Sequence, residues 1–172
     1  MTTVLVTGPI GGGKSTVCSY LASAGMPVYD CDSRCKALYT EVPGLKERIE
    51  RELGIPFPEL RRVFDAPEKL SKLESIVYPL LLKDLEAWKH AQSGPLAFVE
   101  SAIALEKPGF RHVWDKVLMV TAPASLRLMR NPQAALRDTY QHYDNSLVDY
   151  TIDNDSDLES LFAKVDKYLE SL

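Results

Sequence analysis

The feature that most constrains the fold of this chain is the segment "VTGPIGGGKSTV" at residues 6–17. It places four glycines and one lysine directly after a short β-branched run. The stretch from Gly8 to Ser15 matches the pattern G-x-x-x-x-G-K-[S/T] without a mismatch. Glycines at these positions let successive backbone amides point inward at a phosphate, and the helix that follows directs its N-terminus at the same anion. The segment therefore predicts a phosphate-binding loop (P-loop) between a strand and a helix.

The residues of this loop have expected roles in binding a nucleotide. Lys14 is expected to reach the β- and γ-phosphate oxygens, and the Ser15 hydroxyl is expected to bind Mg²⁺. We predict that the following residues contact ATP: Gly8, Ile10, Gly11, Gly12, Gly13, Lys14, Ser15 and Thr16. The alternative is a glycine-rich turn followed by an unrelated lysine, but a strand and a helix flank the motif on the sides that a P-loop requires.

The rest of the chain alternates between strand and helix patterns. Apolar and β-branched runs predict strands at 3–7, 27–30, 96–101, 116–122 and 149–154. Helices are predicted at 14–24, from an N-cap at Asp32 or Ser33 to residue 39, at 71–91 with a kink at Pro79, and at 155–172. This order predicts an α/β protein with the P-loop three-layer fold, in which helices flank a five-stranded parallel sheet.

The length of 172 residues suits one domain, which we divide into a core and an inserted lobe. The core comprises residues 1–40 and 93–172. Residues 41–92 are rich in charged side chains and contain several prolines, so we predict a helical lobe for the acceptor substrate there.

Composition narrows the class of protein. The net charge of −4 argues against a nucleic-acid partner, because such domains carry a basic excess. We expect no membrane span, because no apolar run is long enough. Three cysteines, an odd number without a C-x-x-C pair, predict reduced thiols and a cytoplasmic location. We expect a monomer or a weak homo-oligomer.

Acidic residues stand at the ends of two predicted strands. Asp30 and Asp32 in "DCD" follow the second strand, and Glu100 ends the third in "FVES". Ligands of parallel sheets gather at these carboxyl ends, where a carboxylate can accept a proton or hold Mg²⁺ through water. Helix capping by Asp32 and ordinary strand-end positions for the other two acids remain open. Arg127 and Arg130 lie one helical turn apart after the fourth strand, either near phosphates or on a solvated face.

Several function classes compete at this point. A GTPase is disfavoured, because no N-K-x-D guanine signature follows a strand. A mechanical ATPase is disfavoured, because "LAFVES" places a glutamate where an aspartate is expected after the apolar run. A kinase for a small molecule or nucleotide, and a P-loop protein that binds nucleotide without turnover, both remain.

Nearly the whole chain resembles the dephospho-coenzyme A kinase family of P-loop kinases. "TGPIGGGKST" resembles the family's TGGIGSGKST, and "GMPVYDCD" resembles G-x-x-V-x-D-A-D. "IVYPLL" occupies the place of a helical H-P motif, and "VESAIALEKPGF" resembles E-S-A-I-L-x-E-x-G-F. "DKVLMVTAPASLRLMR" and "DYTIDND" resemble the family's last two strand segments.

The resemblance implies an activity and roles for individual residues. It implies ATP- and Mg²⁺-dependent phosphorylation of the ribose 3′-hydroxyl of dephospho-coenzyme A. Asp32 is then the catalytic base beside Lys14, and Asn154 lies near the adenine. The implied acceptor-binding residues are Asp30, Asp32, Tyr78 and Glu100, and the implied phosphate-side residues are Arg127 and Arg130.

The chain departs from the family pattern at three places. Pro9 replaces a loop glycine, and Tyr78 replaces the histidine before Pro79. After Arg130 the family continues with an arginine-rich helical lid, whereas here "LRLMR" passes directly into "NPQAALRDTYQHYD". Either the lid is shortened or residues are missing at this junction. We expect the second, with Arg130 and Asn131 not being bonded neighbours.

Overall fold

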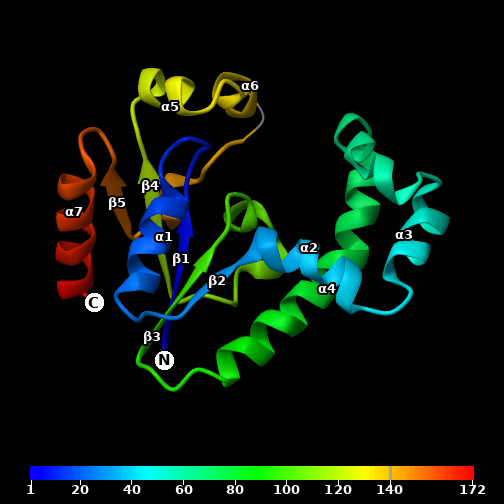
Figure 1. The fold of residues 1–172 in the computed structure, drawn as a ribbon, viewed down its shortest axis with the longest axis horizontal. Helices are drawn as coiled ribbons and strands as arrows, with labels where there is room; N and C mark the ends of the chain where they lie inside the picture. The colour runs from blue at the N-terminus through cyan, green and yellow to red at the C-terminus, as the bar shows by residue number, and fades with distance from the viewer. Residues whose placement is uncertain (140) are drawn as a thin grey trace. The chain divides into compact units, whose positions relative to one another are not determined.

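A computed structural model describes residues 1–139 and 141–172. Its described part contains one five-stranded sheet, in the order β2-β3-β1-β4-β5, and every neighbouring pair is parallel (Figure 1). The strands are β1 (Thr2–Thr7), β2 (Val28–Asp30), β3 (Leu96–Glu100), β4 (Lys116–Thr121) and β5 (Tyr150–Asp153). The predicted fold class, a parallel sheet flanked by helices, is confirmed.

The central strands of the sheet form from runs that are apolar on both faces. Val4, Leu5 and Val6 of β1 are fully buried, as expected for a central strand of a parallel sheet with both faces covered. The strand register aligns Glu100 with Val6 on one side and with Asp30 on the other. The two acids at the carboxyl ends of β2 and β3 therefore lie side by side, next to the strand that leads into the P-loop.

Two helices pack together over one face of the sheet. These are α1 (Lys14–Ser23), which follows the P-loop, and α7 (Leu158–Glu170) near the C-terminus (Figure 1). Tyr20 of α1 stacks on Phe162 of α7, with ring centroids 4.2 Å apart. Their buried side chains join those of the strands in one apolar cluster, which fixes the start of α1 below the P-loop.

The loops after β3 and β4 carry the remaining short helices of the core. After β3 come the short 3₁₀ helices η2 (Ala104–Glu106) and η3 (Pro108–Phe110), of which η2 contacts β1. After β4 come α5 (Ala124–Arg130) and α6 (Ala134–Asp138), followed by η4 (Asn145–Leu147) before β5.

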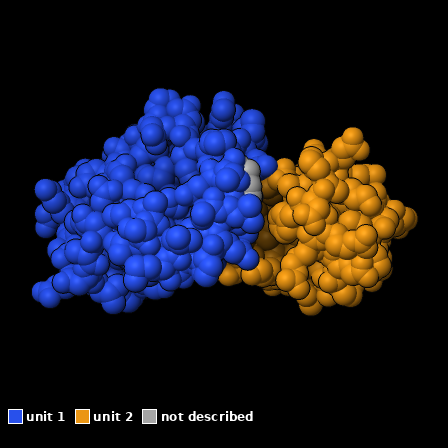
Figure 2. All heavy atoms as spheres, turned by 90° about the horizontal axis from the view of Figure 1, so that it is seen from above, with its two compact units in different colours: residues 1–30, 92–172 blue, residues 31–91 orange. Residues whose placement is uncertain are grey.

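The chain divides into two compact units. Unit 1 comprises residues 1–30 and 92–172, and unit 2 comprises residues 31–91 (Figure 2). Unit 2 is helical and contains α2 (Cys31–Glu41), α3 (Leu45–Leu53), η1 (Phe57–Asp65) and α4 (Pro67–His90). It begins at residue 31 rather than at the expected residue 41, because α2 packs with α3 and α4.

One local expectation about the helices of unit 2 needs correction. Asp32 lies within the first turn of α2 and is not its N-cap, because the helix begins one residue earlier at Cys31. An acid in the first turn still stabilises the helix, through its favourable interaction with the helix dipole. Pro79 lies inside α4, as expected, and the kink at this position stays a prediction.

The expected break after Arg130 is wrong. Arg130 ends α5, and the next amide, of Asn131, donates to the carbonyl oxygen of Arg127 at 2.8 Å. This is the ordinary hydrogen bond at a helix end, so the chain runs directly from Arg130 to Asn131. A helix of five residues, α6, follows. The junction is therefore a short connection within the chain and not a gap in the sequence.

Candidate functional site

The P-loop backbone adopts conformations that only glycine takes readily. Gly8, Gly11 and Gly13 have φ values of +139°, +76° and +106°. A Cβ atom at Gly8 would overlap the carbonyl oxygen of Val120 on β4, and one at Gly12 would lie 2.7 Å from the same atom. The loop therefore lies directly against the end of β4, and its glycines are required by this close approach as well as by backbone conformation.

The departure at Pro9 is accommodated by the loop. The Pro9 carbonyl oxygen accepts a hydrogen bond from the Gly12 amide at 3.1 Å and one from the Lys14 ammonium at 3.3 Å. Proline removes only an amide donor, and the carbonyl that closes this turn is retained. Lys14 also donates to the Gly8 carbonyl oxygen at 2.7 Å, so its charge lies over the loop.

Gly13 precedes α1 in the left-handed conformation and has no side chain to cap the helix. The first amides of α1 therefore receive no side-chain acceptor from the N-cap position, where Ser, Thr, Asp or Asn usually provide one. A helix N-terminus of this kind attracts an anion through its amides and its dipole. The structure thus provides the elements of a phosphate site along Gly8 to Ser15.

At the start of α1, Ser15 donates its hydroxyl to Glu100 at the end of β3, at 2.7 Å. The carboxylates of Glu100 and Asp30, together with burial, raise the pKa of the nearby Cys18 thiol. Burial is the largest cause of this shift. Ser15 and Glu100 therefore form one polar group at the base of the P-loop, with Asp30 on the neighbouring strand.

Asn154 and Arg130 also hold the P-loop, through its backbone carbonyls. The buried Asn154 donates Nδ2–H to the Gly12 carbonyl oxygen at 3.0 Å. Arg130 donates to the Gly11 carbonyl oxygen at 3.1 Å and to the backbone oxygen of Asn154 at 3.4 Å. Both residues were singled out in the sequence, but their hydrogen bonds to loop carbonyls have no sequence signature.

Arg127 has different surroundings from Arg130, although one helical turn separates them. Its guanidinium is nearly buried and binds both carboxylate oxygens of Asp138, at 2.9 and 2.7 Å. It also donates to the carbonyl oxygen of Ala122 at 3.1 Å. The ion pair raises the pKa of Arg127 and holds the pKa of Asp138 below its usual range. Arg127 therefore fastens α5 to α6, and sequence reasoning missed its partner Asp138.

Unit 2 contains the other predicted site residues, Asp32 and Tyr78. Tyr78 on α4 donates its hydroxyl to Glu74 at 3.1 Å. Burial raises the pKa of Tyr78, and the carboxylates of Glu74 and Asp32 raise it further. Burial and the Asp32 carboxylate also raise the pKa of the Cys35 thiol to about 11. Asp32 thus lies close to Tyr78 and Cys35 within this unit, and Glu74 is a member that sequence reasoning missed.

The described residues contain no group of three or more His, Cys, Asp or Glu side chains placed to hold a metal ion. The oxygen atoms of Ser15 and Glu100 are nevertheless hard ligands of the type that Mg²⁺ prefers, and it is usually bound by one or two protein oxygens with water and phosphate. These donors fit Mg²⁺ bound together with a nucleotide. Among the helices that the structure describes, none has the length and apolar character of a membrane span.

Comparison with known proteins places these features in a family. A family model described as dephospho-CoA kinase matches residues 2–159. The dephospho-CoA kinase of Porphyromonas gingivalis is 35% identical over 139 residues, which cover 76% of this chain and 68% of that protein. The enzyme of the same name from Mesorhizobium japonicum is 31% identical, with 97% of this chain and 94% of that protein covered.

A solved structure has a similar fold. A crystal structure of a Thermus thermophilus protein matches with a TM-score of 0.83 at 26% identity, covering 99% of this chain and 97% of that one. The alignment with the Mesorhizobium japonicum protein runs over 194 positions, more than the 172 residues of this chain. That relative therefore contains residues that have no counterpart here. With the P-loop, the strand-end acids and the matched length taken together, the chain belongs to the dephospho-CoA kinase family.

Proposed function

We propose that this protein transfers the γ-phosphoryl group of ATP to the ribose 3′-hydroxyl of dephospho-coenzyme A, giving coenzyme A and ADP. The observation that carries the proposal is the P-loop of a dephospho-CoA kinase family member, with Lys14 above the loop and the Ser15–Glu100 pair at its base. Phosphoryl transfer depends mostly on positioning and charge stabilisation, and these residues supply both for the donor nucleotide.

In this proposal the P-loop amides and the N-terminus of α1 bind the β-phosphate of ATP. Lys14 exchanges its present carbonyl acceptors, Gly8 and Pro9, for phosphate oxygens and stabilises the charge that develops on them. Ser15 and Glu100 would hold Mg²⁺, which when bound neutralises charge on the phosphates. Glu100 also keeps the Ser15 hydroxyl in place before the nucleotide binds.

Asp32 is the residue we propose as the base for the acceptor hydroxyl. It would accept the proton of the 3′-hydroxyl as the oxygen attacks the γ-phosphorus, and ADP would leave with the electron pair of the broken bond. Its place in the first turn of α2, near the Tyr78 hydroxyl, supports an acceptor site in unit 2. Asp30 is the alternative carboxylate.

A shortened lid leaves fewer cations for the phosphates. Arg127 is engaged with Asp138, so we propose Arg130 as the cation that binds the phosphates of ATP on the α5 side. Its guanidinium already contacts the P-loop at Gly11, and it would exchange a carbonyl acceptor for a phosphate oxygen on binding. A kinase without a long lid is expected to exclude water less well, and we therefore expect measurable ATP hydrolysis without acceptor.

The test is a phosphoryl-transfer assay with ATP, Mg²⁺ and a panel of acceptors that includes dephospho-coenzyme A, adenosine monophosphate and shikimate. We expect transfer to dephospho-coenzyme A alone. Transfer to another acceptor would favour the second candidate function, a different small-molecule P-loop kinase. Binding of ATP without transfer to any acceptor would favour a protein that has lost turnover. The short connection after Arg130, in place of a long lid, is the observation that favours this alternative.

Variants of the two acids identify the base. Asp32→Asn should lower kcat at least about 100-fold while KM for ATP stays within about twofold, because a base acts on the acceptor and not on ATP binding. Asp30→Asn tests the alternative carboxylate and should lower kcat much less than Asp32→Asn does. A large loss in Asp30→Asn alone would assign the role to Asp30.

Cytoplasmic location and a monomeric or weakly associated state stay predictions.

A further inference from the structure

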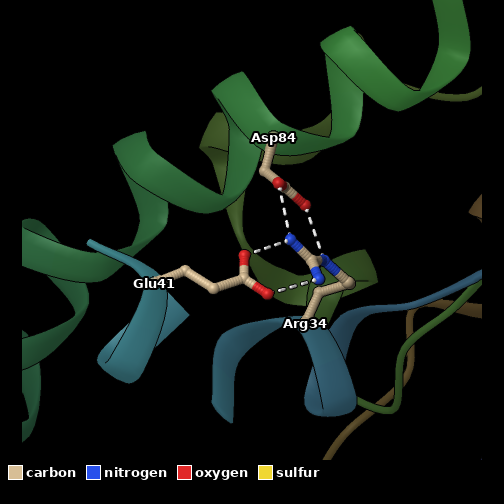
Figure 3. Close-up of polar contacts among 3 residues, drawn as sticks. All are labelled: Arg34, Glu41 and Asp84. Atoms are coloured by element: carbon tan, nitrogen blue, oxygen red, sulfur yellow. Dashed lines mark hydrogen bonds and ion pairs between the residues drawn. The ribbon is translucent and has the colours of Figure 1, made fainter. Parts of the chain in front are cut away.

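Arg34 of α2 forms a polar clamp that holds α2 on α4. Its Nε and Nη2 atoms donate to the two carboxylate oxygens of Asp84 on α4, both at 2.9 Å (Figure 3). Its Nη1 and Nη2 atoms donate to Glu41 at the end of α2, at 3.2 and 2.9 Å. One guanidinium thus binds two carboxylates through two hydrogen bonds each, which is the strong, planar mode available to arginine.

This clamp matters because few apolar side chains of α2 are fully buried. Of its eleven residues, only Cys31 and Leu38 are buried apolar side chains. A helix with a full apolar stripe would be held in the lobe by burial alone. The orientation of α2 depends on polar contacts more than that of such a helix would. Arg34, the centre of the clamp, lies two residues from Asp32.

The arm to Asp84 is the one that links the two helices. The Asp84 side chain is 24% exposed and that of Glu41 is 54% exposed. Glu41 belongs to the same helix as Arg34, so its arm orients the guanidinium without joining separate elements. Asp84 belongs to α4, the helix that also carries Tyr78 and Glu74.

The clamp also balances charge in this part of the lobe. Asp32, Glu41, Glu74 and Asp84 are four carboxylates on α2 and α4, and Arg34 is paired with two of them. Without its guanidinium, like charges on the two facing helices would repel. Loss of Arg34 would therefore both remove the link and add a force that separates α2 from α4.

We propose that Arg34 is a positioning residue for Asp32: by binding Asp84 and Glu41 together it fixes the first turn of α2 against α4, and with it the carboxylate that accepts the acceptor proton. The inference rests on the proposed function for the role of Asp32. It assigns no contact between Arg34 and the substrate, because the guanidinium is already shared between two carboxylates.

The first test measures local opening of α2 in the absence of substrate. The Cys35 thiol is next to Arg34 and is partly exposed, whereas Cys18 and Cys31 are buried. Arg34→Ala should raise the rate of Cys35 modification by a thiol reagent about tenfold, because local opening of α2 exposes the thiol. A Cys35→Ser variant assigns the signal. Arg48→Ala, which removes the 2.8 Å pair with Glu52 on α3 of the same unit, is the matched control and should leave the rate unchanged.

The second test is a kinetic double-mutant cycle. Arg34→Ala should lower kcat about tenfold and leave KM for ATP within about twofold, since the ATP residues lie in unit 1. In the Asp32→Asn background the same change should lower kcat no further, because the base it positions is gone. Arg34→Lys keeps the positive charge but lacks the planar guanidinium, so its kcat should lie between those of the wild type and Arg34→Ala, and so should the kcat of Asp84→Asn. These two variants replace Arg34→Ala in the test if that variant does not fold.

The outcomes separate this inference from the proposed function. An inactive Asp32→Asn together with wild-type kcat in Arg34→Ala and Arg34→Lys overturns the positioning role alone. So does a full tenfold loss that persists in the Asp32→Asn background, or an unchanged Cys35 rate. Wild-type kcat in Asp32→Asn overturns the proposed base and the positioning role together.

Discussion

Asn154 binds Gly12 through a side-chain amide donor at 3.0 Å from the loop carbonyl oxygen, although 142 residues separate the two positions. The side chain is buried, and a Cβ atom added at Gly13 would overlap its Nδ2 atom. The segment after β5 therefore supports the P-loop, and the shape of the loop depends on a donor at position 154. This relationship leads to the first prediction.

Asn154→Ala should raise KM for ATP about tenfold, because the Gly12 carbonyl loses its buried donor and the loop relaxes. Asn154→Asp should be more harmful at pH 7, since a buried carboxylate faces a carbonyl oxygen and can donate no hydrogen bond. Steady-state kinetics and ATP titration measure both. Normal ATP binding in Asn154→Asp together with a raised KM in Asn154→Ala would show that side-chain volume, and not the hydrogen bond, is what the loop needs.

Replacement of Lys14 by alanine should lower kcat by about 100- to 1000-fold, because the phosphates lose their charge compensation in the transition state. The stability of the fold should change little, since the ammonium donates to the Gly8 and Pro9 carbonyls of the loop and not to the apolar core. Circular dichroism and thermal unfolding check the fold, and a phosphoryl-transfer assay checks turnover. Near-normal turnover in Lys14→Ala would contradict the P-loop role.

Glycine substitutions separate backbone strain from simple loss of flexibility. Gly13→Ala should be destabilised by about 1–3 kcal/mol, because a φ of +106° is strained for alanine and its Cβ would displace Asn154. Gly109→Ala is the control, since its φ is not positive and no atom lies within 4 Å of the added Cβ. Urea unfolding of both variants gives the comparison, and similar losses would mean that the loop relaxes freely.

The sheet was predictable because its signal is local. β1, β3 and β4 are short apolar runs between helical segments, and their observed bounds differ from the predicted ones by no more than one residue at either end. The G-x-x-x-x-G-K-S pattern likewise describes one continuous loop. A consecutive stretch of sequence contains all the information that such elements need.

The contacts that complete each part of the site were not predictable in the same way. Arg34 meets Asp84 across 50 positions, and Arg127 meets Asp138 across 11. An arginine and an acid on separate helices have no pattern that pairs them until the helices pack. The N-cap expectation for α2 failed for a related reason: β2 ends at Asp30 and the helix begins directly at Cys31, one residue before Asp32.

The Cys35 thiol provides a prediction about pH. Its pKa is raised to about 11 by burial and by the Asp32 carboxylate, so little thiolate exists at neutral pH. The alkylation rate of Cys35 should rise with pH and continue to rise beyond pH 9. In Asp32→Asn the nearby negative charge is absent, and the rate profile should shift to lower pH. A profile that stays in place would show that Asp32 lies too far from Cys35 to influence it.

The Arg127–Asp138 pair predicts how stability depends on pH. Arg127 holds the pKa of Asp138 below its ordinary value of 3.8, so the carboxylate binds a proton less readily in the folded protein than in the unfolded chain. A lowered folded pKa contributes stability that is fully present above the unfolded pKa and is lost as pH falls through the folded one. Asp138→Asn should therefore destabilise the protein at pH 6–8, and its difference from the wild type should shrink as the pH falls through the lowered pKa of Asp138.

The burial of Arg127 determines how much unfolding free energy is lost when this arginine is replaced. Arg127→Ala should cost about 2 kcal/mol of unfolding free energy, because it also leaves the Ala122 carbonyl and Asp138 without their donor. Arg62→Ala is the matched control: its pair with Glu59 has the same 2.7 Å separation, but the side chains are 70% and 52% exposed, compared with 10% and 39% for Arg127 and Asp138. An exposed pair contributes less than about 1 kcal/mol. Urea unfolding at pH 7 should therefore rank Arg127→Ala well below Arg62→Ala in stability, and equal stabilities would show that α5 and α6 do not depend on this ion pair.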